Sequence, residues 1–158
     1  MNAKLKYKCK TANKTIDFEA IKLYNFINLY LEEIYMKTVE TKNAPAAIGP
    51  YSQAKIVGNM VYCSGQLPVN PATSLIEGKT VSEQTHQSCK NVAALLQAAG
   101  TSIDKVIKTT CFLADIADFS EFNKVYEEYF VTKPARSCVA VKDIPKGALV
   151  EIEVIAEL

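Results

Sequence analysis

The stretch that decides the fold is Pro134-Ala135-Arg136-Ser137-Cys138-Val139-Ala140-Val141, followed after seven residues by Leu149-Val150-Glu151-Ile152-Glu153-Val154-Ile155-Ala156. Both runs are rich in apolar and β-branched residues and alternate with a period of two, which predicts two strands. The segment between them contains Pro145 and Gly147, residue types that are typical of turns. We therefore expect the two strands to pair as an antiparallel hairpin.

The predicted hairpin carries one cation and two acids on strands that are otherwise apolar. Arg136 is the only arginine among the 18 basic residues of the chain. Glu151 and Glu153 share one face of the second strand because they are two residues apart. A guanidinium binds a carboxylate through two parallel hydrogen bonds, which a lysine ammonium does poorly. Two interpretations stay open: Arg136 forms a structural ion pair with one of the glutamates, or it binds the carboxylate of a ligand.

Three further strands are predicted upstream. Residues 52–57 and 60–64 flank Gly58-Asn59, a two-residue turn signal, and so predict a β-hairpin. Residues 103–114 alternate over a longer distance and predict a third strand.

Two helices are expected between these strands. Thr80 and Glu83 have the spacing of a capping box, and apolar residues then recur at helical spacing as far as Gly100. A second helix begins at Asp118. Its apolar face is predicted to contain Phe119, Asn123, Tyr126 and Phe130, of which the asparagine is the exception.

The predicted order of elements is β-β-α-β-α-β-β. Helices interleaved with mostly antiparallel strands indicate an α+β fold, with a single sheet and two helices on one of its faces. The strands carry apolar residues on both faces, so the face without helices must also be covered. Residues 36–158 are long enough to form one domain around one core.

Charge and cysteine content restrict the function. Residues 36–158 contain twelve cations and thirteen acids, a net charge of −1, whereas proteins that bind a nucleic-acid backbone usually carry an excess of basic residues. The five cysteines show no CxxC spacing, which predicts neither a disulfide framework nor a zinc site and favours a reducing compartment such as the cytoplasm. His86 is the only histidine, which argues against a histidine metal centre or a Ser-His-Asp triad. It falls opposite the apolar stripe of its helix, and we expect it to be solvated.

Residues 1–35 form an N-terminal extension of different composition. Apolar residues recur between Ile16 and Ile34 at steps of three and four, which predicts an amphipathic helix; a disordered arm is the alternative. The first fifteen residues carry five lysines and no acid, as in an arm that targets a mitochondrion or another organelle. Against targeting, the apolar run is broken by Asn25 and Asn28 and the extension contains no arginine. We interpret it as an accessory extension or as the product of an overlong gene model.

Three motifs resemble signatures of the Rid (YjgF/L-PSP) family, and within it the reactive intermediate deaminase A group. They are Asn43-Ala44-Pro45-Ala46-Ala47-Ile48-Gly49-Pro50-Tyr51-Ser52-Gln53-Ala54, then Ser64-Gly65-Gln66-Leu67-Pro68, then Pro134-Ala135-Arg136-Ser137 with Glu151-Ile152-Glu153. The resemblance runs from about Met36 to Leu158. It implies a chorismate-mutase-like fold and a homotrimer whose sites lie in clefts between subunits.

The resemblance also implies an enzyme, an enamine/imine deaminase. Such an enzyme hydrolyses 2-iminobutanoate, 2-iminopropanoate and intermediates such as 2-aminoacrylate to a 2-oxo acid and ammonia. The substrate is already electrophilic, so no metal or organic cofactor is expected. Arg136 would bind the substrate carboxylate and Glu151 would activate a water as general base. Glu153 is interpreted as structural.

The remaining site residues of the family match Tyr51, Asn123, Cys138, Ser64 and Gly65. Tyr51 would form a wall of the cleft, Asn123 would hydrogen-bond at that wall, and Cys138 would face the substrate through its backbone. Ser64 and Gly65 would line the pocket. Structural alternatives are packing for Tyr51, a helix-margin position for Asn123 and turn chemistry for Ser64 and Gly65.

Two other functions are associated with relatives of this family. One is an endoribonuclease or translation inhibitor, against which the net charge of −1 argues. The other is a non-enzymatic chaperone or small-molecule-binding trimer, which would need neither Arg136 nor Glu151. We therefore expect the deaminase, with small imine or enamine carboxylates as ligands, a second and third copy of the chain as partners, and neither membrane nor nucleic acid.

Overall fold

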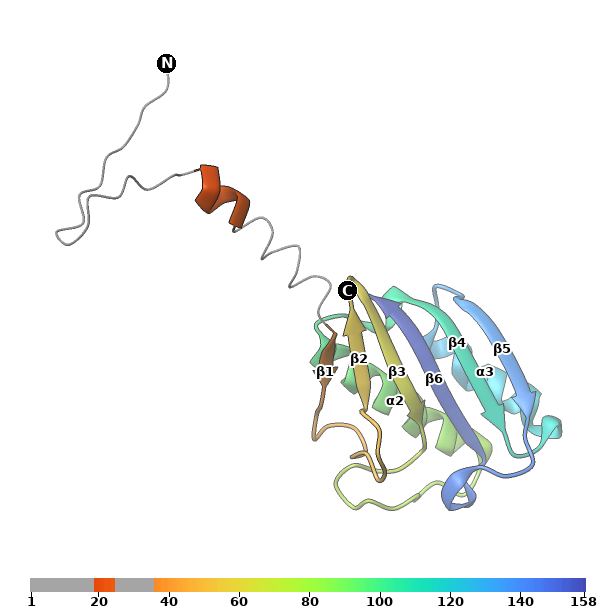
Figure 1. The fold of residues 1–158 in the computed structure, drawn as a ribbon. Helices are drawn as coiled ribbons and strands as arrows, with labels where there is room; N and C mark the ends of the chain where they lie inside the picture. Colours follow the sequence, from red (N-terminus) through yellow and green to blue (C-terminus); the bar gives the residue numbers. More distant parts are fainter. Residues whose placement is uncertain (1–18, 25–35) are drawn as a thin grey trace. The chain divides into compact units, whose positions relative to one another are not determined.

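The computed structural model describes residues 19–24 and 36–158 (Figure 1). The chain divides into two units, Met1–Tyr35 and Met36–Leu158. Residues 19–24 are helical, and the rest of the amphipathic helix predicted between Ile16 and Ile34 lies outside the described residues. Within the described ranges, no helix combines the length and the apolar composition needed to cross a bilayer. Every candidate site residue belongs to the second unit.

Residues 36–158 form a six-stranded sheet with two α-helices, so the predicted α+β fold is confirmed (Figure 1). The strands follow the order β1-β2-β3-β6-β4-β5, and neighbours are antiparallel except β4 and β5. Strand β1 was not predicted, because three residues are too few to show an alternation. The elements are β1 (Lys37–Val39), β2 (Ala54–Val57), β3 (Met60–Gln66), α2 (Val81–Ala99), β4 (Val106–Leu113), α3 (Phe119–Tyr129), β5 (Ala135–Ala140) and β6 (Val150–Glu157), with short 3₁₀ segments at Ile103–Lys105, Ile116–Asp118 and Pro145–Gly147.

The predicted hairpin of the last two strands is wrong, because β4 lies between β5 and β6. Strands joined through a helix pair in parallel, and the β4-α3-β5 connection therefore places β5 at the edge beside β4. Strand β6 instead pairs with β3 on one side and β4 on the other. Its side chains on the helix face, Val150, Ile152 and Val154, are fully buried, as expected for a strand in the middle of a sheet.

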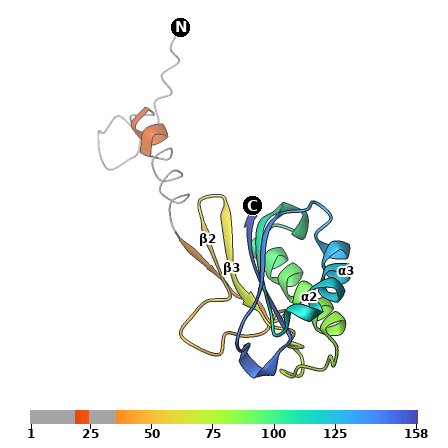
Figure 2. The ribbon, with the colours of Figure 1, turned by 90° about the vertical axis from the view of Figure 1, so that its right-hand side faces the viewer.

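Both helices lie on one face of the sheet (Figure 2). Helix α2 begins at the predicted capping box: the Glu83 backbone N–H donates to Thr80 Oγ1 at 3.2 Å, and the Thr80 N–H donates to Glu83 Oε2 at 3.1 Å. The helix ends at Gly100, whose φ of 91° is readily adopted only by glycine. The sequence therefore identified both ends of α2 correctly.

The buried face of α3 differs from the predicted one. Phe122, Val125 and Tyr126 are buried, whereas Phe119 and Asn123 lie at the margin and are only half-buried. Steps of three and four residues fit both the predicted and the observed face of α3, because Tyr126 belongs to each. Packing against the sheet and α2 decides between them, which a single helix cannot show.

His86 is also less exposed than predicted. It is half-buried, and its Nδ1 lies 3.1 Å from the hydroxyl oxygen of Tyr129 on α3. The two rings meet edge to face, with centroids 5.7 Å apart. The periodicity of α2 does not reveal this contact, because it is α3 that packs beside α2 and covers this side of it.

Neither helix covers the opposite face of the sheet (Figure 2). Alternation along β6 sends Glu151 and Glu153 to this open face. Two large apolar side chains on this face, Tyr62 on β3 and Val139 on β5, are 47% and 46% exposed. The open face therefore exposes apolar side chains, as the sequence predicted, but mixes them with the two glutamates of β6.

Candidate active site

Arg136 lies on the edge strand β5, and its side chain points to the helix face of the sheet. Its Nη1 donates a hydrogen bond to Oδ1 of Asn123 on α3, at 2.8 Å. The guanidinium carbon lies 4.6 Å from the centroid of the Tyr126 ring and 5.5 and 5.8 Å from those of Phe119 and Phe122. The fold thus brings together two of the predicted site residues, Arg136 and Asn123.

The structure excludes the ion pair between Arg136 and the glutamates of β6 within one chain. In the sheet register Arg136 pairs with Thr109, and Thr109 pairs with Val154. Arg136 therefore shares the helix face with Val154, whereas Glu151 and Glu153 point to the open face. The one ion pair found among the described residues joins Lys22 and Glu19. Within residues 36–158, Arg136 has aromatic rings and an amide oxygen as neighbours instead of a carboxylate.

Cys138 follows Arg136 on the same face of β5 and is half-buried. Burial raises the pKa of its thiol, although the Arg136 charge opposes the increase. The thiol is therefore protonated near neutral pH and is a weak nucleophile. This agrees with a role in which Cys138 faces a ligand without reacting with it.

Glu151 lies against the backbone of β3 at Gly65. A Cβ atom built on Gly65 would overlap the Glu151 carboxylate, so a larger residue at position 65 would displace this carboxylate from its observed position. The register between β3 and β6 shifts between Cys63 and Gln66, where the Ser64-Gly65 segment passes this carboxylate. The Ser64 hydroxyl donates to the carbonyl oxygen of Ser52 at 2.7 Å, which fixes the segment. This close approach explains how glycine at position 65 suits the observed position of the Glu151 carboxylate.

The Glu151 carboxyl is half-buried on the open face. Burial raises its pKa above the ordinary value of a glutamate, and the nearby negative charge of Glu153 raises it further. A raised pKa brings a carboxylate closer to the working pH of an enzyme, where a general base is most efficient. Both the position and the pKa of Glu151 suit general-base chemistry.

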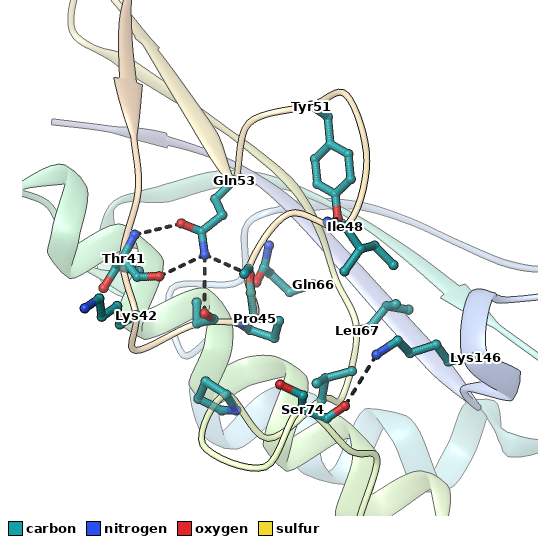
Figure 3. Close-up of a pocket in the computed structure, with 15 residues that line it drawn as sticks. Thr41, Lys42, Pro45, Ile48, Tyr51, Gln53, Gln66, Leu67, Ser74 and Lys146 are labelled. Atoms are coloured by element: carbon teal, nitrogen blue, oxygen red, sulfur yellow. Dashed lines mark hydrogen bonds between the residues drawn. The ribbon is translucent and has the colours of Figure 1, made fainter.

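A cavity of about 360 Å³ opens beside Gly65 (Figure 3). Its volume falls within the range of small-molecule sites. Tyr51 lines the cavity together with Gly65, and the Tyr51 hydroxyl accepts a hydrogen bond from the Ile48 N–H at 3.4 Å. Tyr51 is 51% exposed, so packing within the chain does not account for its position.

Gln53 fixes the loop that carries Tyr51, and the sequence did not single it out (Figure 3). Its side chain is 5% exposed. The carboxamide oxygen accepts from the Thr41 N–H at 2.7 Å, and its nitrogen donates to the carbonyl oxygens of Thr41, Ala44 and Pro45 at 3.0, 3.3 and 2.7 Å. The available signal was its position at the end of the Gly49-Pro50-Tyr51-Ser52-Gln53 motif, where a polar residue enters a strand.

The candidate residues therefore form two groups. The arginine group consists of Asn123, Arg136 and Cys138, on α3 and β5. The glutamate group consists of Tyr51, Ser64, Gly65 and Glu151, around the end of β3 and the start of β6. Strand β4 separates β5 from β6, and Arg136 and Glu151 point to opposite faces. One chain does not bring the two groups together.

A family model described as Endoribonuclease L-PSP matches residues 41–158, most of the chain. The chain belongs to the L-PSP family, also known as Rid or YjgF. The resemblance that the sequence motifs indicated is thus confirmed. The match includes every residue of the arginine and glutamate groups.

Relatives in this family carry different functional names. The chain is 52% identical over 124 residues to the candidate regulator AldR of Lactococcus lactis subsp. lactis, covering 78% of this chain and 98% of that protein. It is 48% identical over 124 residues to the 2-iminobutanoate/2-iminopropanoate deaminase of Escherichia coli K12, covering 76% and 96%. A crystal structure of the Rid-family protein YyfA of Yersinia pestis, described as of unknown function, has a TM-score of 0.76 at 49% identity and covers 78% of this chain and all of that one. Relatives named as deaminases support an enzyme, while the regulator and endoribonuclease names leave its specific activity to be argued from the site.

Proposed function

We propose that this L-PSP family member is an imine deaminase, which hydrolyses small 2-imino carboxylates to a 2-oxo acid and ammonia. The observation that carries the proposal is the environment of Arg136. Its guanidinium is held by Asn123 and aromatic rings and has no carboxylate partner within residues 36–158. A half-buried cation in this state can bind the carboxylate of a ligand through its free N–H groups. The deaminase name of the Escherichia coli relative supports the same reaction.

The reaction needs a bound carboxylate, a positioned water and one proton-transfer group. Water adds to the imine carbon, and Glu151 accepts the proton that the water loses. The proton is returned to the imine nitrogen, which gives a carbinolamine with a hydroxyl and an amino group on the same carbon. The hydroxyl proton is then transferred to the nitrogen as the C–N bond breaks, so the oxygen becomes the carbonyl of the 2-oxo acid and ammonia leaves with both protons of the water. The imine carbon is already electrophilic, so no oxidant or cofactor enters this balance. Holding water and imine in contact can lower the barrier by several kcal/mol.

The other candidate residues shape the site around this reaction. Asn123 orients Arg136 through its amide oxygen. Gly65 gives room to the Glu151 carboxylate, and Ser64 fixes that segment. Tyr51 forms a wall of the neighbouring cavity, and Cys138 borders Arg136 as a protonated thiol.

The active unit is proposed to be a homotrimer with sites shared between subunits. Within one chain Arg136 and Glu151 lie on different faces of the sheet, so the reaction requires the arginine group of one copy to meet the glutamate group of another. The exposed apolar residues of the open face give the copies a surface to bury. The number three follows from the family resemblance.

Shared sites can be tested by mixing two inactive variants. Arg136→Lys and Glu151→Gln chains, produced together, should assemble into mixed trimers in which about one quarter of the sites contain both intact residues. Imine hydrolysis should therefore reappear to about that fraction, and sedimentation equilibrium should give the mass of three chains. Inactivity of the mixed trimers, with each variant folded, would show that one chain supplies both groups.

The reaction itself can be tested with imines produced in situ by an amino-acid oxidase. The protein should accelerate release of the 2-oxo acid and shorten the lifetime of the imine, measured by trapping the remaining imine with semicarbazide. The uncatalysed hydrolysis in water must be subtracted. Rates equal to this background, with cleavage of an added RNA instead, would favour the endoribonuclease alternative over the deaminase.

A further inference from the structure

The guanidinium of Arg136 lies among three aromatic rings of α3. Tyr126 is the nearest, at 4.6 Å from ring centroid to guanidinium carbon, and Phe119 and Phe122 follow at 5.5 and 5.8 Å. All three distances are within the range of cation–π attraction. Phe122 and Tyr126 are buried, so this attraction acts away from bulk water.

Aromatic rings stabilise a cation without neutralising it. A carboxylate in their place would pair with the guanidinium and compete with any anionic ligand. A ring face attracts the positive charge and takes up no N–H group. Only Nη1 of Arg136 donates to Asn123, which leaves other N–H groups of the guanidinium for a ligand.

The Tyr126 ring is itself held against β4, the strand that pairs with the strand of Arg136. Its hydroxyl and that of Thr109 form a hydrogen bond of 2.9 Å, and Thr109 is fully buried and pairs with Arg136 in the β4–β5 register. Tyr126 also stacks on Phe130, with centroids 4.4 Å apart and an interplanar angle of 23°. The aromatic face that meets the guanidinium is therefore held by one contact on β4 and one just beyond the end of α3.

From this geometry we infer that Tyr126 is a positioning residue: its ring holds the Arg136 guanidinium by cation–π attraction in the orientation that binds the substrate carboxylate. The inference rests on the proposed function for the identity of the ligand. Tyr126 does not touch the reacting atoms and acts through Arg136. Weakening the ring's attraction should lower affinity for a carboxylate without changing the proton chemistry at Glu151.

The test replaces residue 126 in the full chain by phenylalanine and then by phenylalanines with one, two and three ring fluorines. Fluorine withdraws electron density from the ring face while keeping the shape of the ring. We expect the dissociation constant for 2-oxopropanoate, the product of 2-iminopropanoate hydrolysis, to rise stepwise with fluorine number, by about tenfold over the series. In the imine assay KM should rise in parallel while kcat stays nearly constant.

Phe130 offers a matched control. It is buried and aromatic and stacks on Tyr126, but the cation–π contacts of Arg136 do not include it. The same fluorine series at position 130 should leave 2-oxopropanoate affinity unchanged. A constant affinity across the series at position 126, or an equal loss at position 130, would overturn the positioning role. Stepwise loss of binding in a protein without imine turnover would instead sustain the role of Tyr126 and refute only the deaminase.

Discussion

Replacing Arg136 by lysine is expected to keep the protein folded and assembled but to lower kcat/KM for imine hydrolysis on the order of 10²-fold. Lysine retains the charge and loses the planar set of N–H groups that binds a carboxylate in two places. It also loses the hydrogen bond from Nη1 to Asn123, so the ammonium is no longer oriented. Steady-state kinetics with a 2-imino carboxylate measures the loss, and a thermal unfolding scan checks the fold.

Lys142 provides the reciprocal control for this substitution. It is exposed just beyond the end of β5, and the structure gives it no role in either group of site residues. Lys142→Arg exchanges the same two residue types and should leave turnover near that of the unchanged protein. Normal turnover in a folded Arg136→Lys protein would refute carboxylate binding by the guanidinium.

Local structure was predictable where neighbouring residues determine it. The Gly58-Asn59 turn joins β2 and β3 as predicted, with Val57 opposite Met60, and the Thr80–Glu83 capping box starts α2. Pairing between distant strands was not predictable from alternation. Alternation identifies a strand and its two faces, but says nothing about which strand lies beside it. The helix crossover between β4 and β5 decided the position of β5 and displaced β6 to the centre of the sheet.

The candidate site, too, was predictable in its local features and not in its long-range contacts. The sequence identified Arg136 and Glu151 as candidate site residues. The alternation along each strand also predicted correctly which neighbouring residues share a face with each of them. The assumed hairpin then placed them on neighbouring strands, and only the sheet order shows that they are separated within a chain. The contact of Gly65 with Glu151 joins residues far apart in the sequence, and the close approach of the carboxylate to Gly65 appears only when both strands are placed.

Replacing Glu151 by glutamine is expected to have the largest effect of all, a loss of roughly 10²–10⁴-fold in turnover, as for removal of a general base. Glutamine keeps nearly the same size and so still fits against Gly65. It no longer accepts a proton from the attacking water. Binding of 2-oxopropanoate through Arg136 should persist, and a titration of that ligand separates the loss of the base from a loss of binding.

Glu153 is the control for this loss, because it lies two residues further along the same face of β6, a separation of about 6.6 Å. One water can contact only one of the two carboxylates. Glu153→Gln should therefore change turnover far less than Glu151→Gln. Its main effect should appear in the pH profile. A base works when deprotonated, so turnover falls as the pH drops through its pKa.

Burial and the charge of Glu153 both raise the pKa of Glu151, with burial the larger cause. Removing the Glu153 charge should therefore lower the pKa of Glu151 and move the acid limb of the kcat profile to lower pH, while the contribution of burial remains. An acid limb that stays in place would mean that the group titrating in the profile is not Glu151. A larger loss of turnover in Glu153→Gln than in Glu151→Gln would reverse the assignment of the base, because the like-charge effect on a pKa cannot by itself remove the proton acceptor.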